Sequence, residues 1–129
     1  MQSMALFDLA SRQSQWLTQR QTVIAGNIAN ANTPGFKARE IKAFDAAMDA
    51  AANSAPSLTL THPMHLAEAG TVARLSDVQQ EKTGEVLQSG NDVDLEQEFL
   101  KTGEIMKTFN LNNQIVKAFN RMLYTATKV

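Results

Sequence analysis

Both ends of the chain carry apolar residues at helical spacing. In residues 4–31 the apolar positions recur three, four, seven and eight residues apart, which fits the 3.6-residue period of an amphipathic helix. These positions are Leu6, Leu9, Trp16, Leu17, Val23, Ile24 and Ile28. The segment is therefore predicted to form one long helix. It is expected to end among its asparagines, because Asn tolerates a left-handed C-terminal position.

A second and longer pattern covers residues 93–127. Its apolar positions alternate between spacings of four and three, typical of a helix that packs along another helix. The inner positions are Ile105, Phe109, Asn112, Val116, Phe119, Leu123 and Ala126. Asn112 is the polar exception, and a single polar inner residue fixes the register of packing at some cost in stability. Asp94 is the expected N-cap, with Glu96 and Glu98 in the first turn, where the helix dipole favours acids.

The middle of the chain has weaker patterns. Residues 32–52 predict a turn followed by a short helix, and residues 36–52 are helix-prone throughout. Residues 53–92 predict an irregular connection in which the alternation at 57–62 favours a short strand, with room for one small β-hairpin. The expected fold class is mainly α, an elongated, coiled-coil-like hairpin of the two terminal helices in a single domain. Helices of roughly 40 and 50 Å cannot be covered by so small a chain, so part of each apolar stripe should face neighbouring chains.

The end of the first helix, "NIANANTPGF" at residues 27–36, is uncharged and rich in amides. It consists of three asparagines, Asn27, Asn30 and Asn32, and a turn, Thr33, Pro34, Gly35 and Phe36. Proline followed by glycine suits the two central positions of a type II turn. One interpretation of the stretch is a simple helix stop. The other is a contact site, in which the amides bind the backbone of an adjacent chain and the aromatic ring fills a neighbour's pocket. The residues alone leave both open.

Composition narrows the functional classes. The chain has 12 Lys and Arg against 13 Asp and Glu, a net charge of −1, which argues against a general nucleic-acid-binding protein. It has no cysteine, so a disulfide framework and a zinc–thiolate site are excluded. His62 and His65 have no third ligand at suitable spacing, which favours surface histidines over a metal site. The acids at 92–98 do not follow the calcium-loop spacing and fit the start of a helix better.

No cleaved secretory signal and no membrane span is expected. The apolar residues near the N-terminus are interrupted by Asp8 and Arg12, and no run approaches about 18 apolar residues. Nothing in the sequence predicts an enzyme, a cofactor or a small-molecule substrate.

The order of residues at the end of the first helix follows N-x-x-N-x-x-T-x-G-aromatic, at Asn27, Asn30, Thr33, Gly35 and Phe36. It resembles the N-terminal signature of the bacterial flagellar rod and hook protein family. The segment "NDVDLEQEF" at 91–99, which opens the second helix, resembles that family's C-terminal part, and the two ends cover about half of the chain. The middle has no room for the large inserted domains of distal members, so the resemblance is to a short proximal rod protein. The chain departs from the family at Asn32, where Asp is usual, and at Phe36, where Tyr is usual.

The resemblance implies a structural role without catalysis. Subunits of this family pass through the flagellar type III export apparatus without a cleaved signal. They assemble in the periplasm, above the membrane ring and export gate, with copies of themselves and with neighbouring rod proteins into the drive shaft that transmits torque. The terminal helices would stack with those of neighbours, and the turn would lock between them. The expected interface residues are Asn27, Asn30, Asn32, Thr33, Pro34, Gly35 and Phe36, with Trp16 and Val23 in the first helix and Phe109, Asn112, Val116, Phe119 and Leu123 in the second.

Other functions remain compatible with the sequence. The nearest is another short proximal rod protein of the same family. A soluble helical-hairpin adaptor or export chaperone would be folded and of small, fixed stoichiometry when purified alone. A small metal enzyme would depend only on His62 and His65.

Overall fold

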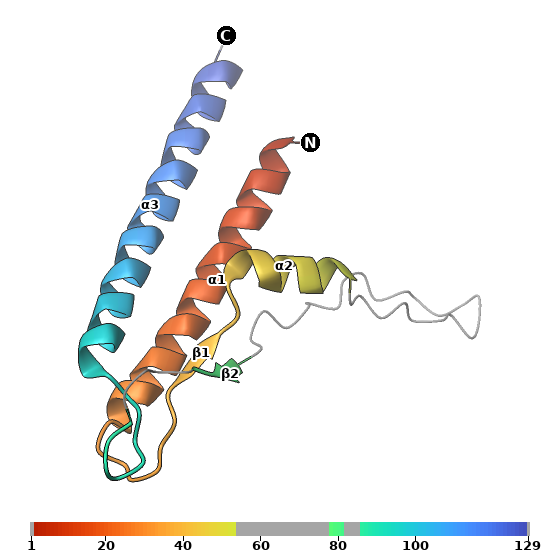
Figure 1. The fold of residues 1–129 in the computed structure, drawn as a ribbon. Coiled ribbons are helices and arrows are strands. Elements are labelled where there is room, and N and C mark those ends of the chain that lie inside the picture. Colours follow the sequence, from red (N-terminus) through yellow and green to blue (C-terminus); the bar gives the residue numbers. More distant parts are fainter. Residues whose placement is uncertain (1, 54–77, 82–85, 129) are drawn as a thin grey trace, which may run out of the picture.

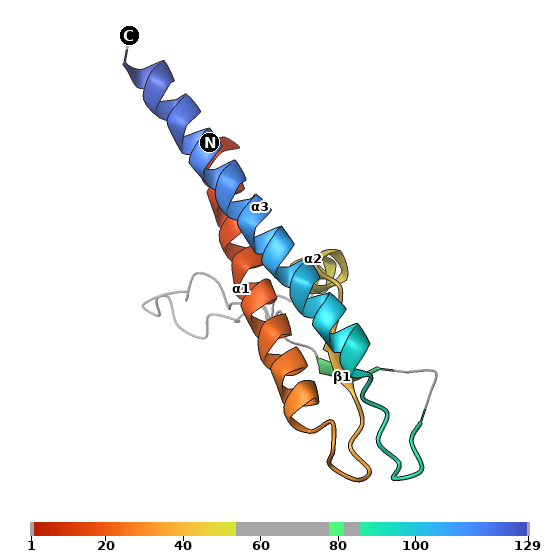
Figure 2. The ribbon, with the colours of Figure 1, turned by 90° about the vertical axis from the view of Figure 1, so that its left-hand side faces the viewer.

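The computed structural model describes residues 2–53, 78–81 and 86–128 of the chain. The described elements, in chain order, are α1 (Gln2–Ala29), β1 (Arg39–Ile41), α2 (Phe44–Asn53), β2 (Val78–Gln80) and α3 (Leu95–Thr127). α1 and α3 lie side by side and antiparallel, so the molecule is an elongated helical hairpin (Figures 1 and 2). The mainly α fold with long terminal helices, predicted from the sequence, is confirmed. None of the described helices is long and apolar enough to span a membrane.

The hairpin has two unlike ends. The loops after α1 and before α3 meet at one end, which we call the tip (residues 30–36 and 86–94). The start of α1 and the end of α3 lie at the other, which we call the open end (residues 2–10 and 117–128). Both views show α3 continuing past the start of α1 (Figures 1 and 2).

A narrow apolar seam joins the two long helices. Leu17, Ile24 and Ile105 form its buried centre, and Trp16 and Ile28 pack against them. Burying a side chain of this size stabilises a fold by about 1.5–3 kcal/mol. A seam with so few fully buried large side chains gives the isolated hairpin modest stability.

The start of α3 follows the sequence prediction. The Asp94 side chain accepts hydrogen bonds from the N–H groups of Glu96 (2.9 Å) and Gln97 (3.4 Å), as an N-cap does. The helix begins at Leu95, two residues after the predicted start, and ends at Thr127 as predicted.

The segment after the first turn is strand rather than helix. β1 pairs with β2 in antiparallel register, with Arg39 opposite Gln80 and Ile41 opposite Val78. The helix expected from residue 36 begins only at Phe44. The expectation was wrong for 36–43 because partners distant in sequence hold this backbone extended, and such tertiary contacts override local propensity. The strand expected at 57–62 lies outside the described residues.

The start of α2 contacts α1 through one aromatic pair. The Trp16 ring meets Phe44 edge-on at 5.9 Å between centroids, and the indole N–H donates to the carbonyl of Lys42 (2.9 Å). Figure 1 shows α2 projecting from the side of α1 that faces away from α3. The helix therefore stands out as a lateral arm of the hairpin.

Candidate assembly interface

The turn after α1 has the geometry that its sequence predicts. The N–H of Phe36 donates to the carbonyl of Thr33 (3.2 Å), and Gly35 has a φ of 74°. This left-handed value is required at the second central position of a type II turn, which explains the glycine.

The end of α1 is capped by a side chain instead of the expected left-handed asparagine. Among the described residues only glycines have positive φ. The side chain of Asn30 donates to the carbonyl of Gly26 (2.8 Å), and Thr33 Oγ1 donates to Asn30 Oδ1 (3.1 Å). The amide thus satisfies a carbonyl near the helix end and is itself held by the turn.

A second loop closes against this turn, and we call residues 30–36 and 87–93 together the clasp. Asn91 is its centre and is only 1% exposed. Its side chain donates to the carbonyls of Asn30 (2.9 Å) and Thr33 (2.8 Å). One asparagine of the second loop therefore binds both the end of α1 and the turn that follows it.

The two loops also approach each other through their backbones. The N–H of Gly35 donates to the carbonyl of Ser89 (2.9 Å). Gly90 has a φ of 81°, and a Cβ there would lie 3.4 Å from the Cα of Gly35. Close to this contact, Asp92 Oδ1 accepts the N–H of Ala38 (2.6 Å). The clasp is therefore closed by groups that the chain supplies itself.

Asn27 joins three segments from a buried position. Its side chain donates to the carbonyl of Arg39 (2.7 Å) and accepts the N–H of the same residue (3.0 Å), so it pairs with β1 as a strand would. Nδ2 also donates to the carboxylate of Glu98 in α3 (3.0 Å). With 1% exposure, this amide serves its own chain. The structure thus gives Asn27 partners within the chain, and its contact with a neighbour stays a prediction.

A cluster of charges lies beside Asn27 where α1, β1, β2 and α3 meet. Arg20 binds Glu40 with two hydrogen bonds, Nε to Oε1 (3.1 Å) and Nη2 to Oε2 (3.0 Å). Lys101 binds Glu98 (Nζ to Oε1, 3.0 Å) and Glu81, and its Nζ lies 3.7 Å from Glu40. Glu98 is 1% exposed and the Lys101 side chain 13%. Because removing one member would leave a buried charge without its partner, the cluster ties the four elements into one unit.

The surroundings of Lys101 shift the pKa of its ammonium group. Burial lowers the pKa of this ammonium group, but the hydrogen bonds and charges of Glu81 and Glu98 act in the opposite direction and outweigh it. The net result is a pKa raised above the ordinary 10.5. Lys101 is therefore a permanent cation at physiological pH.

Asn112 occupies an inner position of α3, as the heptad pattern indicates, with 6% exposure. Its side chain donates to the carbonyl of Ala10 (2.9 Å) and to Ser14 Oγ (2.8 Å) on α1. A shift of one helix along the other would leave this amide unpaired. The contact therefore favours one register of α1 on α3.

The other expected interface residues divide into two groups. Trp16 packs against Phe44, and Phe119 meets Phe7 edge-on at 5.5 Å between centroids, so both aromatic rings are used within the chain. The half-buried residues are Trp16, Val23, Asn30, Phe36, Val116, Phe119 and Leu123. The exposed residues are Asn32, Thr33, Pro34, Gly35 and Phe109. Only the second group is fully available to a neighbouring chain in this conformation.

α3 also exposes large apolar side chains on both sides of the stripe that it packs on α1. One flank carries Phe99 and Met106, which are 61% and 60% exposed and seven residues apart. The other carries Leu111, Ile115 and Met122, which follow at spacings of four and seven and are 46–61% exposed. Residues three, four or seven apart share one face of a helix. A subunit with two such flanks presents apolar surface in two directions.

Near the seam, a small groove lies between the long helices. It has a volume of about 300 Å³ and is lined by Leu17, Thr18, Gln21, Ile105, Met106, Phe109 and Asn110. Met106 and Phe109 form its exposed rim. The groove is therefore continuous with one of the apolar flanks.

The sequence indicates only part of the polar network next to the tip. Glu98 is an acid of the first turn, as predicted, and it is also buried and bonded to Asn27 and Lys101. No sequence pattern indicates the roles of Asn91 and Lys101. A buried partner of Asn27 lies 71 residues away in sequence, and no local spacing reports such a pairing. His62 and His65 lie outside the described residues. No group of three potential metal ligands occurs within the part of the chain that the structure describes.

Comparison with known proteins agrees with this geometry. Residues 9–37, which contain most of α1 and its turn, match the family profile described as "Flagella basal body rod protein". The flagellar basal body rod protein FlgB of Agrobacterium fabrum is 42% identical over 130 residues, covering 99% of this chain and 96% of its own length. FlgB of Escherichia coli K12 is 34% identical over 87 residues, 62% of each chain, and FlgB of Aeromonas hydrophila is 37% identical over 84 residues, 63% of this chain and 61% of its own. The chain therefore belongs to the FlgB family of flagellar basal body rod proteins.

Proposed function

We propose that this chain is a structural subunit of the proximal rod that works by helix packing between copies and with adjacent rod proteins. The observation that carries the proposal is the pair of exposed apolar flanks on α3. An isolated globular protein rarely exposes so much apolar surface on one element, and such patches mark interaction sites. Neighbouring helices on both sides would bury it, and torque would then be shared by many parallel helix contacts.

The division of labour within the chain supports this role. The hydrogen bonds that close the clasp are formed within the chain, so the tip can keep its shape before assembly. The exposed turn residues Asn32, Thr33 and Pro34 are then presented on a fixed backbone. We infer that a neighbouring chain contacts the exposed turn residues. Hydrogen bonds of Asn27, Asn30 and Asn91 fix the backbone conformation that this contact requires.

Export and location follow from the same proposal. The subunit would pass through the flagellar type III export apparatus and assemble in the periplasm without catalysing a reaction. A seam with few large buried residues suits a chain that must be threaded through a narrow channel. The modest stability expected of the free hairpin is consistent with this route.

Purification of flagellar basal bodies tests the proposal directly. The chain should co-purify with the rod, and deletion of its gene should abolish swimming. The rival, a soluble adaptor or export chaperone, should remain in the cytosolic fraction in a small complex of fixed size. Absence of the chain from purified basal bodies of swimming cells would overturn the rod assignment.

The turn is tested by comparing export with swimming. Phe36→Ala removes a half-buried ring that lies under the Arg39 guanidinium (5.8 Å), and Pro34→Ala removes an exposed one. If neighbours recognise the turn, swimming should fall in both variants while the amount of exported chain stays constant. Normal swimming of both variants would exclude a contact role, and lost export would assign the turn to the export step.

A further inference from the structure

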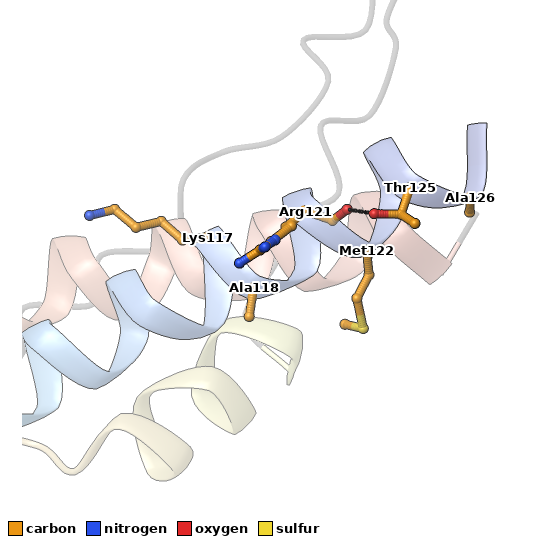
Figure 3. Close-up of a pocket in the computed structure, with 6 residues that line it drawn as sticks. All are labelled: Lys117, Ala118, Arg121, Met122, Thr125 and Ala126. Carbon is orange, nitrogen blue, oxygen red and sulfur yellow. Dashed lines mark hydrogen bonds between the residues drawn. The ribbon is translucent and has the colours of Figure 1, made fainter. Parts of the chain in front are cut away.

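The open end of α3 carries a hollow that the contacts described above do not use. It has a volume of about 720 Å³ and is lined by Lys117, Ala118, Arg121, Met122, Thr125 and Ala126, all on one helix (Figure 3). The small side chains at 118 and 126 leave room for close approach, and Met122 between them is 61% exposed. Figure 3 shows Lys117 and Arg121 extending along one side of the hollow while Met122 points to the other. The surface is apolar along its centre and basic along one edge.

The charge of this surface is one-sided. After Glu104, α3 contains no acidic residue, although it contains Lys107, Lys117 and Arg121. Neither Lys117 nor Arg121 forms an ion pair with any residue that the structure describes. A partner for this edge should therefore carry acids spaced one helical turn apart.

α2 has the complementary features. Its residues include Asp45 and Asp49 and no basic residue. Both acids are exposed, and so is Ala46 beside them. Asp45 and Asp49 are four residues apart, as are Lys117 and Arg121, so each pair rises roughly 6 Å along its helix. The acidic pair lies beside Ala46 and the basic pair beside Ala118. Because alanine is small, two helices can pack closely enough there for the acidic pair to meet the basic pair.

α2 cannot reach the hollow of its own chain. α2 packs on α1 at Trp16, which lies level with Ile105 because Leu17 and Ile105 share the core. The hollow begins at Lys117, 12 residues further along α3, which is roughly 18 Å. α2 also projects from the side of α1 that faces away from α3 (Figure 1).

We propose that the hollow at the open end of α3 receives α2 of a second copy of this chain, with Asp45 and Asp49 facing Lys117 and Arg121. The inference rests on the proposed rod function and names the surfaces through which two copies meet. When α2 of one copy enters the hollow of the next copy without the reciprocal contact, the interface is heterologous and does not close as a symmetric pair. Each copy keeps a free α2 or a free hollow for the next one, displaced along the long axis of the hairpin. The contact therefore propagates, as an axial assembly requires.

Disulfide trapping tests the contact between copies. The chain has no cysteine, so one copy with Ala46→Cys and a differently tagged copy with Ala118→Cys can form a mixed disulfide only with each other. The mixed dimer should form in basal bodies isolated from cells that express both. The matched control replaces Ala118→Cys with Glu96→Cys, which lies in the first turn of α3 next to the tip and should give none. If both cysteine copies are present in basal bodies and the mixed dimer does not exceed the control, the contact is refuted while the rod function stands.

Charge reversal gives an independent test. K117E/R121E and D45K/D49K should each abolish swimming while export and the circular dichroism of the purified chain remain unchanged. The four-fold variant restores opposite charges and should regain most of the wild-type swimming rate. K107E, a single charge reversal on the same helix outside the hollow, should swim normally. Normal swimming of both double variants, or no recovery in the four-fold variant, would overturn the proposal.

Discussion

The two ends of the hairpin formed by α1 and α3 differ in how their side chains are covered. At the tip and in the helix turns that adjoin it, Asn27, Asn91 and Glu98 are each 1% exposed, and every one of them has hydrogen-bond partners within the chain. At the open end, Met122 and Tyr124 are 61% and 66% exposed. One region is held by polar contacts that the chain supplies itself, and the other leaves apolar surface uncovered.

The difference shows what each region is built to do. Buried polar groups specify one geometry, because a misplaced partner leaves an unsatisfied donor or acceptor. Exposed apolar side chains do not fix a geometry by themselves. They stabilise a structure only when a neighbouring group covers them. The tip should therefore define the shape of the free subunit, and the open end should gain its stability in the assembly. Substitutions at the two ends should separate these effects.

The largest effect on the free subunit is expected from Asn27→Ala. The change removes two hydrogen bonds to the backbone of Arg39 and one to Glu98, leaving that buried carboxylate with fewer donors. The free energy of unfolding should fall by about 3 kcal/mol, as expected for a lost bond to a charged group plus unsatisfied buried groups. Urea unfolding followed by circular dichroism measures it.

Asn32→Ala is the matched control for this change. Asn32 is exposed in the same stretch, so its replacement should alter the free energy of unfolding by less than about 0.5 kcal/mol. Equal stabilities of the two variants would mean that the tip is not ordered by Asn27 in the free subunit.

Two glycine-to-alanine substitutions should change the stability of the free subunit in opposite directions. Gly90→Ala places a Cβ at a φ of 81° and 3.4 Å from Gly35 Cα, which should destabilise the clasp by about 1–2 kcal/mol. Gly103 lies inside α3, and a Cβ added there would have no other group within 4 Å, so Gly103→Ala should stabilise the chain by up to about 1 kcal/mol. Thermal unfolding of both variants checks the signs. A stabilising Gly90→Ala would show that the two loops are apart in solution.

The sequence predicted the parts of this molecule that are set by local pattern. The long helices follow from apolar spacing, the N-cap from Asp94, and the turn from Pro34 followed by Gly35. These features need only residues within a few positions of each other, so a single sequence reports them.

The parts that the sequence did not predict depend on distant partners. Residues 39–41 are helix-prone, yet they form a strand because Asn27 and β2 take up their backbone groups. The sequence does not indicate that Asn27 bonds Glu98, which lies 71 residues away, or that the Asn30 carbonyl accepts from Asn91, which lies 61 residues away. An amide has the same hydrogen-bonding groups whether its partner is internal or external, and only the fold distinguishes the two.

The pH dependence of the free energy of unfolding tests the charge cluster around Lys101, which lies beside Asn27. The pKa of Lys101 is raised in the folded chain above the 10.5 of the unfolded one, so its contribution is complete below that value. The contribution is lost as the pH rises through the folded pKa. Stability should therefore be flat from about pH 8 to 10 with respect to this group and fall above that range.

Substitution by arginine isolates this contribution. Lys101→Arg keeps the cation charged at alkaline pH, since guanidinium deprotonates only above about pH 12. The variant should lose less stability than the wild type between about pH 10 and 12, whereas Lys107→Arg, at an exposed site, should behave as the wild type does. Parallel alkaline losses in all three chains would mean that Lys101 is not held by its carboxylates in solution.

The smallest change in the stability of the free subunit is expected from a substitution on an exposed apolar flank of α3. The same substitution should have a large effect on assembly. Ile115 is 46% exposed on one apolar flank of α3, so Ile115→Ser removes little buried surface from the hairpin. Its free energy of unfolding should change by less than about 0.5 kcal/mol, the usual range for surface substitutions. In the rod, a neighbour that covers the exposed part of this side chain would lose roughly half of the transfer free energy of a fully buried group, about 1 kcal/mol at each subunit contact. Swimming should therefore fall sharply at unchanged export and monomer stability, while Gln114→Ser, exposed on the same helix one residue earlier, should leave all three unchanged. Unimpaired swimming of Ile115→Ser would place this flank outside the contacts between subunits, and a marked loss of monomer stability would show that the free chain already covers it.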